Sequence, residues 1–379
     1  MKESVQVIRA RSFARAGLLG NPSDGYFGKT ISFSFTAFYV DLRLTESARL
    51  RFVPGEVDDA SFESPQQLVR DLRLYGYYGG IRMLKAVAKL FFEYCEEHAI
   101  KIADVNFTAE YKINIPRLVG LSGSSAICSA MLKALMEFYG VEIPLEDQPT
   151  LIMCAERDEL GIACGLQDRV AQIYNGLTFM DFDRALMEET GHGRYERLDP
   201  KSVPNLYIAY DPRRAEESGK AHKKVKKLFQ QQDHDVMAAM SEFADIAQKG
   251  RDLLVNSAVG LHSTIRRFDD STISPPSSPV ANLNSRLSTL INANFDLRDK
   301  IFHVAEENRR MVMTARSVGA SAKFAGSGGA IVGTYEDDAQ YSALVTALEG
   351  IGCRTLKPVI ASKRDESADL DTSALWRNS

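Results

Sequence analysis

Residues 116–130 read Pro-Arg-Leu-Val-Gly-Leu-Ser-Gly-Ser-Ser-Ala-Ile-Cys-Ser-Ala and decide how the first half of the chain folds. A glycine- and serine-rich loop opens here into an apolar run of helical character, and the alternating segment 105–115 before it is typical of a strand. The first turn of a helix has N–H groups without partners and carries the positive end of the helix dipole. The stretch therefore predicts an anion site on a strand–loop–helix unit.

Individual residues of this loop suit a phosphate group. Gly120 and Gly123 have no Cβ, so the backbone can approach a ligand closely. The hydroxyls of Ser122, Ser124 and Ser125 can bond phosphate oxygens or a metal ion. The loop lacks the lysine of the common P-loop, so a nucleotide bound here would be held in a different way. Composition alone leaves a purely structural turn equally open.

Composition narrows the class of protein. A chain of 379 residues with 45% hydrophobic content can bury two cores, so we expect two domains. The net charge of −4 argues against a nucleic-acid partner. Five cysteines without Cys-x-x-Cys spacing favour reduced thiols. No stretch approaches the roughly 20 apolar residues of a membrane span, and the N-terminus has no signal-peptide core, so we expect a soluble, cytoplasmic protein with no membrane partner.

The order of strand-like and helical segments favours an α+β fold. In the first half, strand patterns occupy 5–11, 31–44, 105–115 and 177–182, and helical patterns occupy 79–99 and 151–160. After a charged break at 184–204, strand patterns occupy 205–210, 322–334 and 353–360, and helical patterns occupy 233–259, 280–317 and 338–350. A polar, proline-rich loop is expected at 269–279. We predict domains at 1–195 and 196–362, followed by a polar tail at 363–379.

Two acidic residues stand twelve positions apart. Glu156 lies in a helical pattern, and Asp168 follows the turn Cys-Gly-Leu-Gln. One carboxylate could hold Mg²⁺, which prefers oxygen ligands, and the other could accept a proton from a substrate hydroxyl. The alternative is that both are solvated surface acids, although the mixed apolar surroundings of Asp168 weaken it. Arg169 could clamp a phosphate or carboxylate, or could be an exposed cation.

A second glycine turn follows Lys323, where residues 323–333 read Lys-Phe-Ala-Gly-Ser-Gly-Gly-Ala-Ile-Val-Gly. A Gly-Ser-Gly-Gly turn between apolar runs could pack its backbone against a ligand. It could equally be a plain hairpin.

Taken in order, these segments resemble the motifs of the GHMP small-molecule kinases, the family of galactokinase, homoserine kinase and mevalonate kinase. The family's second motif, Pro-x-x-x-Gly-Leu-Gly-Ser-Ser-Ala, is matched by 116–126 with an altered glycine placement. Its first motif resembles 15–24, Arg-Ala-Gly-Leu-Leu-Gly-Asn-Pro-Ser-Asp, and its third resembles 323–329. The resemblance spans 9–333 and implies a two-domain α+β GHMP kinase fold, with a ribosomal-protein-like N-terminal domain and a ferredoxin-like α/β sandwich after it.

The resemblance implies roles for individual residues. A helix Glu followed by Cys-Gly-x-x-Asp is similar to the galactokinase pattern, so Asp168 is expected to be the catalytic base and Glu156 a Mg²⁺ ligand. Ser125 is expected to be the other Mg²⁺ ligand, and Arg15 to steady the transferring phosphoryl group. The residues expected to contact ATP are Pro116, Gly120, Leu121, Ser122, Gly123, Ser124, Ser125, Ala126, Gly326, Ser327 and Gly328.

Within the family, residues 20–29 and 165–172 are most similar to the plant-type glucuronokinases, which phosphorylate the anomeric hydroxyl of D-glucuronate. Asn21 and Pro22 stand where galactokinases have Glu-His, which argues against galactose. By the same resemblance Asp24 is expected to bond sugar hydroxyls.

The remaining substrate contacts follow from the charge of such a sugar. The carboxylate of glucuronate needs a cationic partner, and arginine offers bidentate geometry. The candidates are Lys29, Arg157 and Arg169, and Gly329 is expected to lie against the substrate.

The implied activity is ATP-dependent phosphorylation of a small sugar acid, giving glucuronate 1-phosphate and ADP and feeding UDP-glucuronate formation. One alternative is another GHMP kinase, acting on a neutral sugar or a heptose phosphate; the latter would need extra cations. The other is a catalytically silent ligand sensor, which the presence of Asp168, Glu156 and Ser125 disfavours. The oligomeric state stays open.

Overall fold

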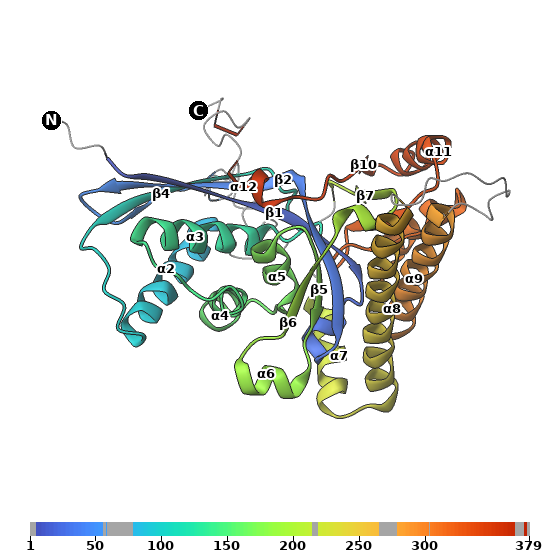
Figure 1. Cartoon of the computed structure of the whole chain (residues 1–379), viewed down its shortest axis with the longest axis horizontal. Helices are drawn as coiled ribbons and strands as arrows, with labels where there is room; N and C mark the ends of the chain where they lie inside the picture. The colour runs from blue at the N-terminus through green and yellow to red at the C-terminus, as the bar shows by residue number, and fades with distance from the viewer. Residues whose placement is uncertain are drawn as a thin grey trace, which may run out of the picture.

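Two β-sheets, each with helices packed on it, carry the chain (Figure 1). The computed structural model describes residues 5–55, 58, 79–213, 219–264, 279–302, 304–367 and 375–376. The first sheet has the order β3-β4-β2-β5-β6, with β1 also paired to β2, and the second has the order β10-β7-β9-β8. Helices and sheets are mixed along the chain, which confirms the α+β prediction.

The first sheet is built on two long antiparallel strands, β1 (Val7–Leu19) and β2 (Lys29–Ser47). One half of β2 pairs with β4 (Asn106–Ile113) and the other half with β5 (Leu177–Asp181). The short strands β3 (Arg51–Phe52) and β6 (Arg194–Leu198) complete the sheet. The register of β1 on β2 shifts between Phe13 and Ala14 and again between Gly17 and Leu19, and such irregularities bend a strand and re-aim its side chains.

Helices α2 (Gly80–Glu97), α3 (Gly123–Tyr139) and α5 (Gln167–Tyr174) contact this sheet, and α4 (Gln148–Cys154) packs on these three helices (Figure 1). Helix α3 is buried nearly all round, as its run of small and apolar side chains requires. A single π-helical turn, Ala155–Glu159, continues α4. Between β5 and β6 lies α6 (Arg184–Thr190).

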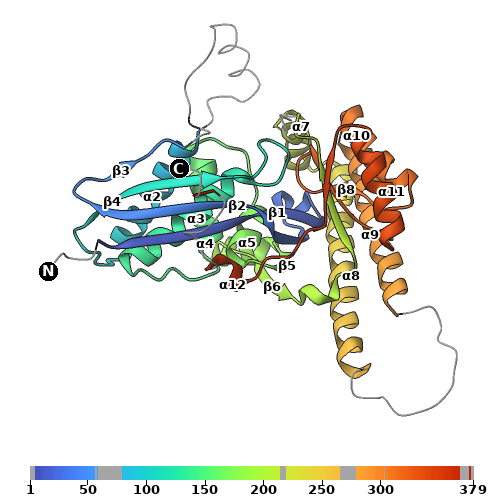
Figure 2. The same ribbon diagram turned by 90° about the horizontal axis from the view of Figure 1, so that it is seen from above.

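The second sheet consists of β7 (Leu206–Tyr210), β8 (Lys323–Phe324), β9 (Ala330–Thr334) and β10 (Arg354–Leu356). Helices α8 (His234–Thr264) and α9 (Pro279–Ile301) run side by side, as Figure 2 shows. The remaining helices are α7 (Gly219–Gln230), α10 (Glu306–Ser317), α11 (Asp338–Glu349) and α12 (Lys363–Glu366). Because α8 contacts β2, and α9 contacts β1, the second half of the chain lies against the first.

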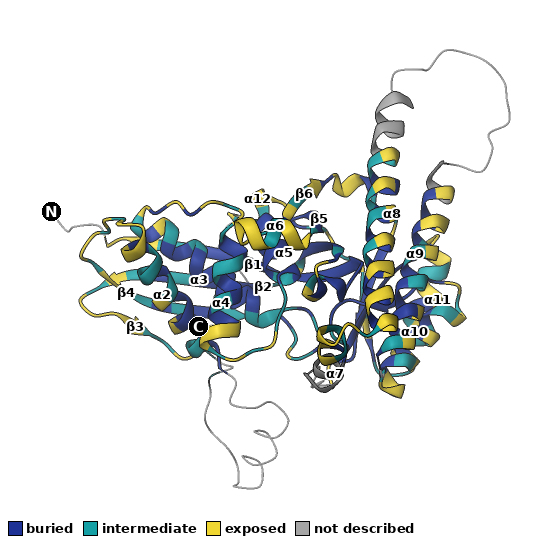
Figure 3. Cartoon of the chain, turned by 90° about the horizontal axis from the view of Figure 1, so that it is seen from below, coloured by how far each residue is buried: buried dark blue, intermediate teal, exposed yellow. Residues whose placement is uncertain are grey.

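One hydrophobic core crosses this junction. It joins Phe33 of β2 to Phe243 of α8, Leu287 of α9 and Val332 of β9. Buried segments of both halves of the chain are dark blue in Figure 3. A smaller cluster around Tyr207 and Leu344 lies within the second half. In the part of the chain that the structure describes, no helix is long and apolar enough to cross a membrane.

Several element boundaries differ from the sequence prediction. The expected helix 280–317 is two helices, α9 and α10. A single helix was predicted because the apolar pattern continues across the residues between them. The expected break at 184–204 contains α6 and β6, a strand of the first sheet. The predicted domain boundary at 195 falls inside β6, and the division into domains stays a prediction. The expected loop at 269–279 lies, apart from its last residue, outside the described residues, as does most of the tail.

Candidate active site

The loop that leads into α3 presents backbone donors at the surface. Helix α3 begins at Gly123, and its N-cap Ser122 has a left-handed φ of 64°. Gly120 has a φ of +76°. A left-handed serine is strained and is characteristic of functional sites. Gly120 and residues 122–124 are only half-buried, so the unpartnered N–H groups of the first turn can reach a ligand.

Other predicted residues of this loop support it from inside. Ser125 is fully buried, and its hydroxyl donates to the carbonyl of Ser122 at 3.3 Å. Leu121 and Ala126 are buried in the core, and Pro116 lies half-buried before the loop.

The two glycine-rich loops touch each other. A Cβ on Gly326 would lie 2.2 Å from the carbonyl oxygen of Gly120, and a Cβ on Gly120 would lie 2.6 Å from the carbonyl oxygen of Gly328. Any larger residue would force the loops apart, so this contact requires glycine at both positions. A Cβ on Gly329 would approach Val119 Cα at 3.0 Å. The structure therefore brings together two loops that are about two hundred residues apart in sequence.

Asp168 lies beside both loops, in the first turn of α5. Its Oδ1 accepts a hydrogen bond from Arg15 Nε at 2.6 Å, and its Oδ2 accepts one from the Ser122 hydroxyl at 2.6 Å. Burial raises the pKa of Asp168, but the charges of Arg15 and Arg169 and these hydrogen bonds hold it below the usual 3.8. Asp168 is therefore ionised at neutral pH and can accept a hydrogen bond or a proton.

Arg15 connects the site's parts. It lies on β1 and is 5% exposed. Its Nη1 donates to the carbonyl oxygens of Gly120 at 3.0 Å and Ala325 at 2.7 Å, while its Nε donates to Asp168. One guanidinium thus fixes the carboxylate relative to both loops.

Glu156 and Arg169 form a buried ion pair. Arg169 donates from Nε to Glu156 Oε2 at 2.8 Å and from Nη2 to the same oxygen. Burial opposes the charge of Arg169, but Glu156 raises the pKa of the guanidinium overall. Arg169 also donates to the carbonyl of Gly165 and lies 3.7 Å from Asp168 Oδ2. Arg169 is therefore engaged by protein acceptors.

The other oxygen of Glu156 is available to a cation. Glu156 is fully buried, and its Oε1 receives no hydrogen bond within the described part of the chain. No group of three or more His, Cys, Asp or Glu side chains that could hold a metal occurs among the described residues. A site made from Glu156 and Ser125 would therefore take its other ligands from phosphate or water.

Asp24 lies close to the carboxylate of the proposed base. It sits in the short 3₁₀ turn Ser23–Tyr26, and its Oδ2 accepts a hydrogen bond from the N–H of Gln167 at 3.4 Å. A Cβ on Gly165 would lie 2.2 Å from the same oxygen, so glycine is required there. Burial, and secondarily the charge of Asp168, raises the pKa of Asp24 to about 6.

Two of the cations predicted to bind the substrate, Lys29 and Arg157, contact other protein side chains. Lys29 Nζ lies 3.1 Å from Asp181 and donates to Gln248 at 3.0 Å. Arg157 is exposed and pairs with its neighbour Asp158 at 2.7 Å. A role of either residue in substrate binding stays a prediction.

Sequence reasoning missed buried polar residues that support the site from α9 and α10. Asn294 accepts from the N–H of Gly20 at 2.6 Å, and Asn308 accepts from the N–H of Gly329 at 3.2 Å. Arg298 donates to the carbonyls of the second glycine loop. The available signal was a set of polar residues on otherwise apolar helix faces.

Lys323 is the first residue of the third motif, and the sequence assigned it no role. Its side chain is buried beside the second glycine loop. Its ammonium donates to the carbonyls of Gly17 at 2.6 Å and Phe324 at 2.8 Å and to Asn21 Oδ1 at 2.5 Å. Burial, then the charges of Arg298 and Arg15, lowers the pKa of Lys323 well below 10.5. Its three donors tie β1 to β8.

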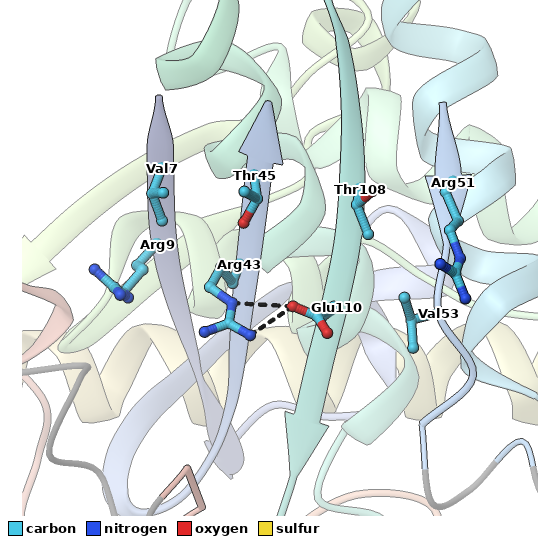
Figure 4. Close-up of a pocket in the computed structure, with 8 residues that line it drawn as sticks. All are labelled: Val7, Arg9, Arg43, Thr45, Arg51, Val53, Thr108 and Glu110. Atoms are coloured by element: carbon cyan, nitrogen blue, oxygen red, sulfur yellow. Dashed lines mark hydrogen bonds and ion pairs between the residues drawn. The ribbon is translucent and has the colours of Figure 1, made fainter. Parts of the chain in front are cut away.

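A groove of about 570 Å³ lies elsewhere, on the open face of the first sheet (Figure 4). Arg9, Arg43 and Arg51 line it, and Arg43 donates to Glu110 at 2.6 Å. The ring of Trp376 lies 4.6 Å from the Arg43 guanidinium. The groove includes none of the predicted site residues.

Comparison with known proteins shows which chains this one is similar to. The family model for the GHMP kinases N terminal domain matches residues 82–176. Glucuronokinase 1 of Arabidopsis thaliana is 40% identical over 336 residues, covering 87% of this chain and 85% of that protein. Probable glucuronokinase 2 of the same plant is 42% identical over 333 residues, 86% of this chain and 84% of the relative. The crystal structure of Lactococcus lactis galactokinase complexed with galactose shares the fold, with a TM-score of 0.66, 16% identity and 94% of each chain covered.

Proposed function

Because this chain belongs to the GHMP kinase family and is similar to glucuronokinases over most of its length, we propose that it transfers the γ-phosphoryl group of ATP to the anomeric hydroxyl of D-glucuronate. The products are glucuronate 1-phosphate and ADP. The observation that carries the proposal is the position of Asp168, which lies where Arg15 joins the two glycine-rich loops. A cytoplasmic location remains a prediction.

Backbone donors would bind the triphosphate. The first turn of α3 and the contacting turn 326–328 provide N–H groups in one place, and oriented backbone dipoles stabilise phosphate charge without reorganising. The P-loop lysine is replaced in this arrangement by Arg15, whose guanidinium already lies between the two loops. Pro116, Leu121 and Ala126 would support the loop.

Asp168 would orient the sugar hydroxyl and take its proton as the oxygen attacks the γ-phosphorus. An anomeric hydroxyl is more acidic than an ordinary alcohol, so a carboxylate of lowered pKa suffices. Arg15 would hold the carboxylate in place and offset the charge that develops on the transferring group. Asp24, close to Asp168, would accept hydrogen bonds from neighbouring sugar hydroxyls.

Glu156 and Ser125 would hold Mg²⁺ together with phosphate oxygens. The buried Oε1 of Glu156 fits this role, because carboxylate and hydroxyl oxygens are the ligands that Mg²⁺ prefers. The ion, when bound, supplies positive charge beside the phosphates. Arg169 would keep Glu156 ionised and oriented.

A coupled assay of ADP release tests the proposal across glucuronate, galacturonate, glucose, galactose and a heptose phosphate. We expect kcat/KM for glucuronate to exceed that for glucose at least tenfold, because a site built to bind a charged group of its substrate rejects the analogue that lacks that group. Equal rates on the two sugars would refute glucuronate as the substrate. Preference for the heptose phosphate would move the chain to another branch of the family.

A further inference from the structure

Arg298 holds two consecutive carbonyls of the second glycine loop. This residue of α9 is 5% exposed, and it donates from Nη1 to Gly326 O at 2.9 Å and from Nη2 to Ser327 O at 2.8 Å. Its guanidinium carbon also lies 5.1 Å from the centroid of the Phe324 ring and 5.5 Å from that of Phe302. A planar fork with fixed spacing thus binds two neighbouring peptide groups at once.

The planarity of the peptide bond links these carbonyls to the donors of the loop. In a trans peptide the carbonyl and the following N–H point in opposite directions. Since the carbonyls of Gly326 and Ser327 point to Arg298, the N–H groups of Ser327 and Gly328 point away from it.

The first glycine loop lies on that opposite side. A Cβ on Gly120 would lie 3.2 Å from the nitrogen of Ser327 and 3.4 Å from the nitrogen of Gly328. Ser327 is also half-exposed, in contrast to the buried residues on either side of it. The two N–H groups are therefore beside the half-exposed turn where α3 begins.

The loop needs such a restraint. Gly326, Gly328 and Gly329 lie within four residues, and glycine populates conformations that other residues avoid, so peptide groups here can rotate easily. A rotated peptide would point a carbonyl oxygen, with its partial negative charge, at bound phosphate. Arg15 fixes the preceding carbonyl, that of Ala325, from the other side of the loop.

We propose that Arg298 is a positioning residue for phosphoryl transfer: it holds the carbonyls of Gly326 and Ser327 away from the cleft so that the N–H groups of Ser327 and Gly328 serve as donors to the phosphates of ATP. The inference rests on the proposed kinase activity. It adds a residue of α9 that contacts neither ATP nor sugar but fixes the loop that does.

The test compares Arg298→Met and Arg298→Lys with the matched control Arg316→Met. Arg316 is also a largely buried arginine in the second half, donating to the carbonyls of Asn292 at 3.0 Å and Ala322 at 3.3 Å and lying over Phe295. We expect Arg298→Met to lower kcat/KM for ATP about 10²-fold, the effect typical of losing a preorganised donor. Arg298→Lys should recover only part of this loss, because an ammonium cannot bind both carbonyls in a fork. Arg316→Met should change kcat/KM less than threefold.

A second measurement separates positioning from a structural role. Calorimetric binding of AMP and of ATP to each folded variant reports on the phosphates without any sugar. Arg298→Met should weaken ATP binding at least tenfold and AMP binding less than threefold. Equal loss for both nucleotides, or kcat/KM for ATP within threefold of the parent chain, would overturn the proposal. Failure of the parent chain to phosphorylate any sugar would instead refute the proposed function, while the ATP-to-AMP ratio would still test Arg298.

Discussion

Two arginines of strand β1 each pair with an aspartate from another element, and the two pairs serve different purposes. On β1, Arg11 binds Asp41 through both oxygens, at 2.6 and 3.1 Å, and four residues later Arg15 binds Asp168 through one oxygen at 2.6 Å. Arg11 and Asp41 face each other in the β1–β2 register, and Arg11 also lies over Tyr39. The first pair is complete within the sheet.

In the second pair, the carboxylate of Asp168 is partly exposed. The side chain of Asp168 is 21% exposed, compared with 2% for Asp41, and among the described residues its second oxygen contacts a serine hydroxyl and the more distant Arg169. Arg15 reaches loops from both halves of the chain, whereas Arg11 serves neighbouring strands. A closed pair stabilises the sheet, while an open pair keeps a charged acceptor available to substrate.

The largest expected effect is that of Asp168→Asn. The change removes the proton acceptor with little change in volume, so kcat should fall about 10²–10⁴-fold. Binding of ATP, measured by calorimetry, should stay within threefold, and the free energy of unfolding should fall by less than the roughly 3–5 kcal/mol of a fully broken buried pair, because Arg15 keeps its two carbonyl acceptors. Turnover near that of the parent chain would eliminate Asp168 as the base.

The matched change in the closed pair, Asp41→Asn, should act in the opposite way. It leaves the Arg11 charge buried without a counter-charge, and breaking such a pair costs about 3–5 kcal/mol. Urea unfolding monitored by circular dichroism measures this loss. The kcat of the folded protein should stay within twofold; a loss of kcat larger than the loss of folded protein would show that the two pairs are not separate.

The smallest effect concerns pH and separates Asp24 from Asp168. Asp24, with a pKa raised to about 6, becomes ionised as the pH rises through 6, so kcat/KM for glucuronate should rise severalfold between pH 5 and 7. Asp168 titrates below 3.8 and gives no change in this range. In Asp24→Asn the rise near pH 6 should disappear. Its persistence in that variant would assign it to another group.

The raised pKa of Asp24 also determines how the free energy of unfolding changes with pH. A carboxyl group whose pKa is higher in the folded state favours folding when protonated, so its contribution is lost as the pH rises from about 4 through 6. Asp168, with its lowered pKa, contributes stability above 3.8 that is lost on further acidification. The acid that we propose binds the substrate, Asp24, therefore weakens the fold at neutral pH, where the ionised form would accept hydrogen bonds from the sugar.

Local sequence patterns predicted the first glycine loop. The rest of the site is formed by contacts between residues that lie far apart in the sequence. The loop 120–126 belongs to a strand–loop–helix signal contained within residues 105–130, so its structure followed from the sequence. The contact of Arg15 with Asp168 spans 153 positions; the family resemblance gave each residue a separate role and did not predict that they touch. Glu156 and Arg169 were considered as separate candidates, because nothing in their spacing states that they share a buried ion pair.

The residues missed altogether are those whose role depends on the second half's packing. Arg298, on a helix with otherwise ordinary periodicity, becomes recognisable only when α9 is seen beside the glycine loop. Dependence on tertiary packing is also why the sequence predicted a single helix at 280–317, where the structure has two. Its apolar periodicity continues past Ile301, where α9 ends, into α10, which begins at Glu306.

The contact between Gly120 and Gly326 has a consequence for synthesis. The first loop, β1 and Asp168 have all emerged from the ribosome well before Ala325 and Gly326, and domains begin to fold from the N-terminal side. Arg15 therefore gains its final acceptor, the carbonyl of Ala325, only after 310 further residues have been added to the chain. If both loops bind ATP as proposed, a chain that ends before Ala325 should bind ATP more weakly than the full chain.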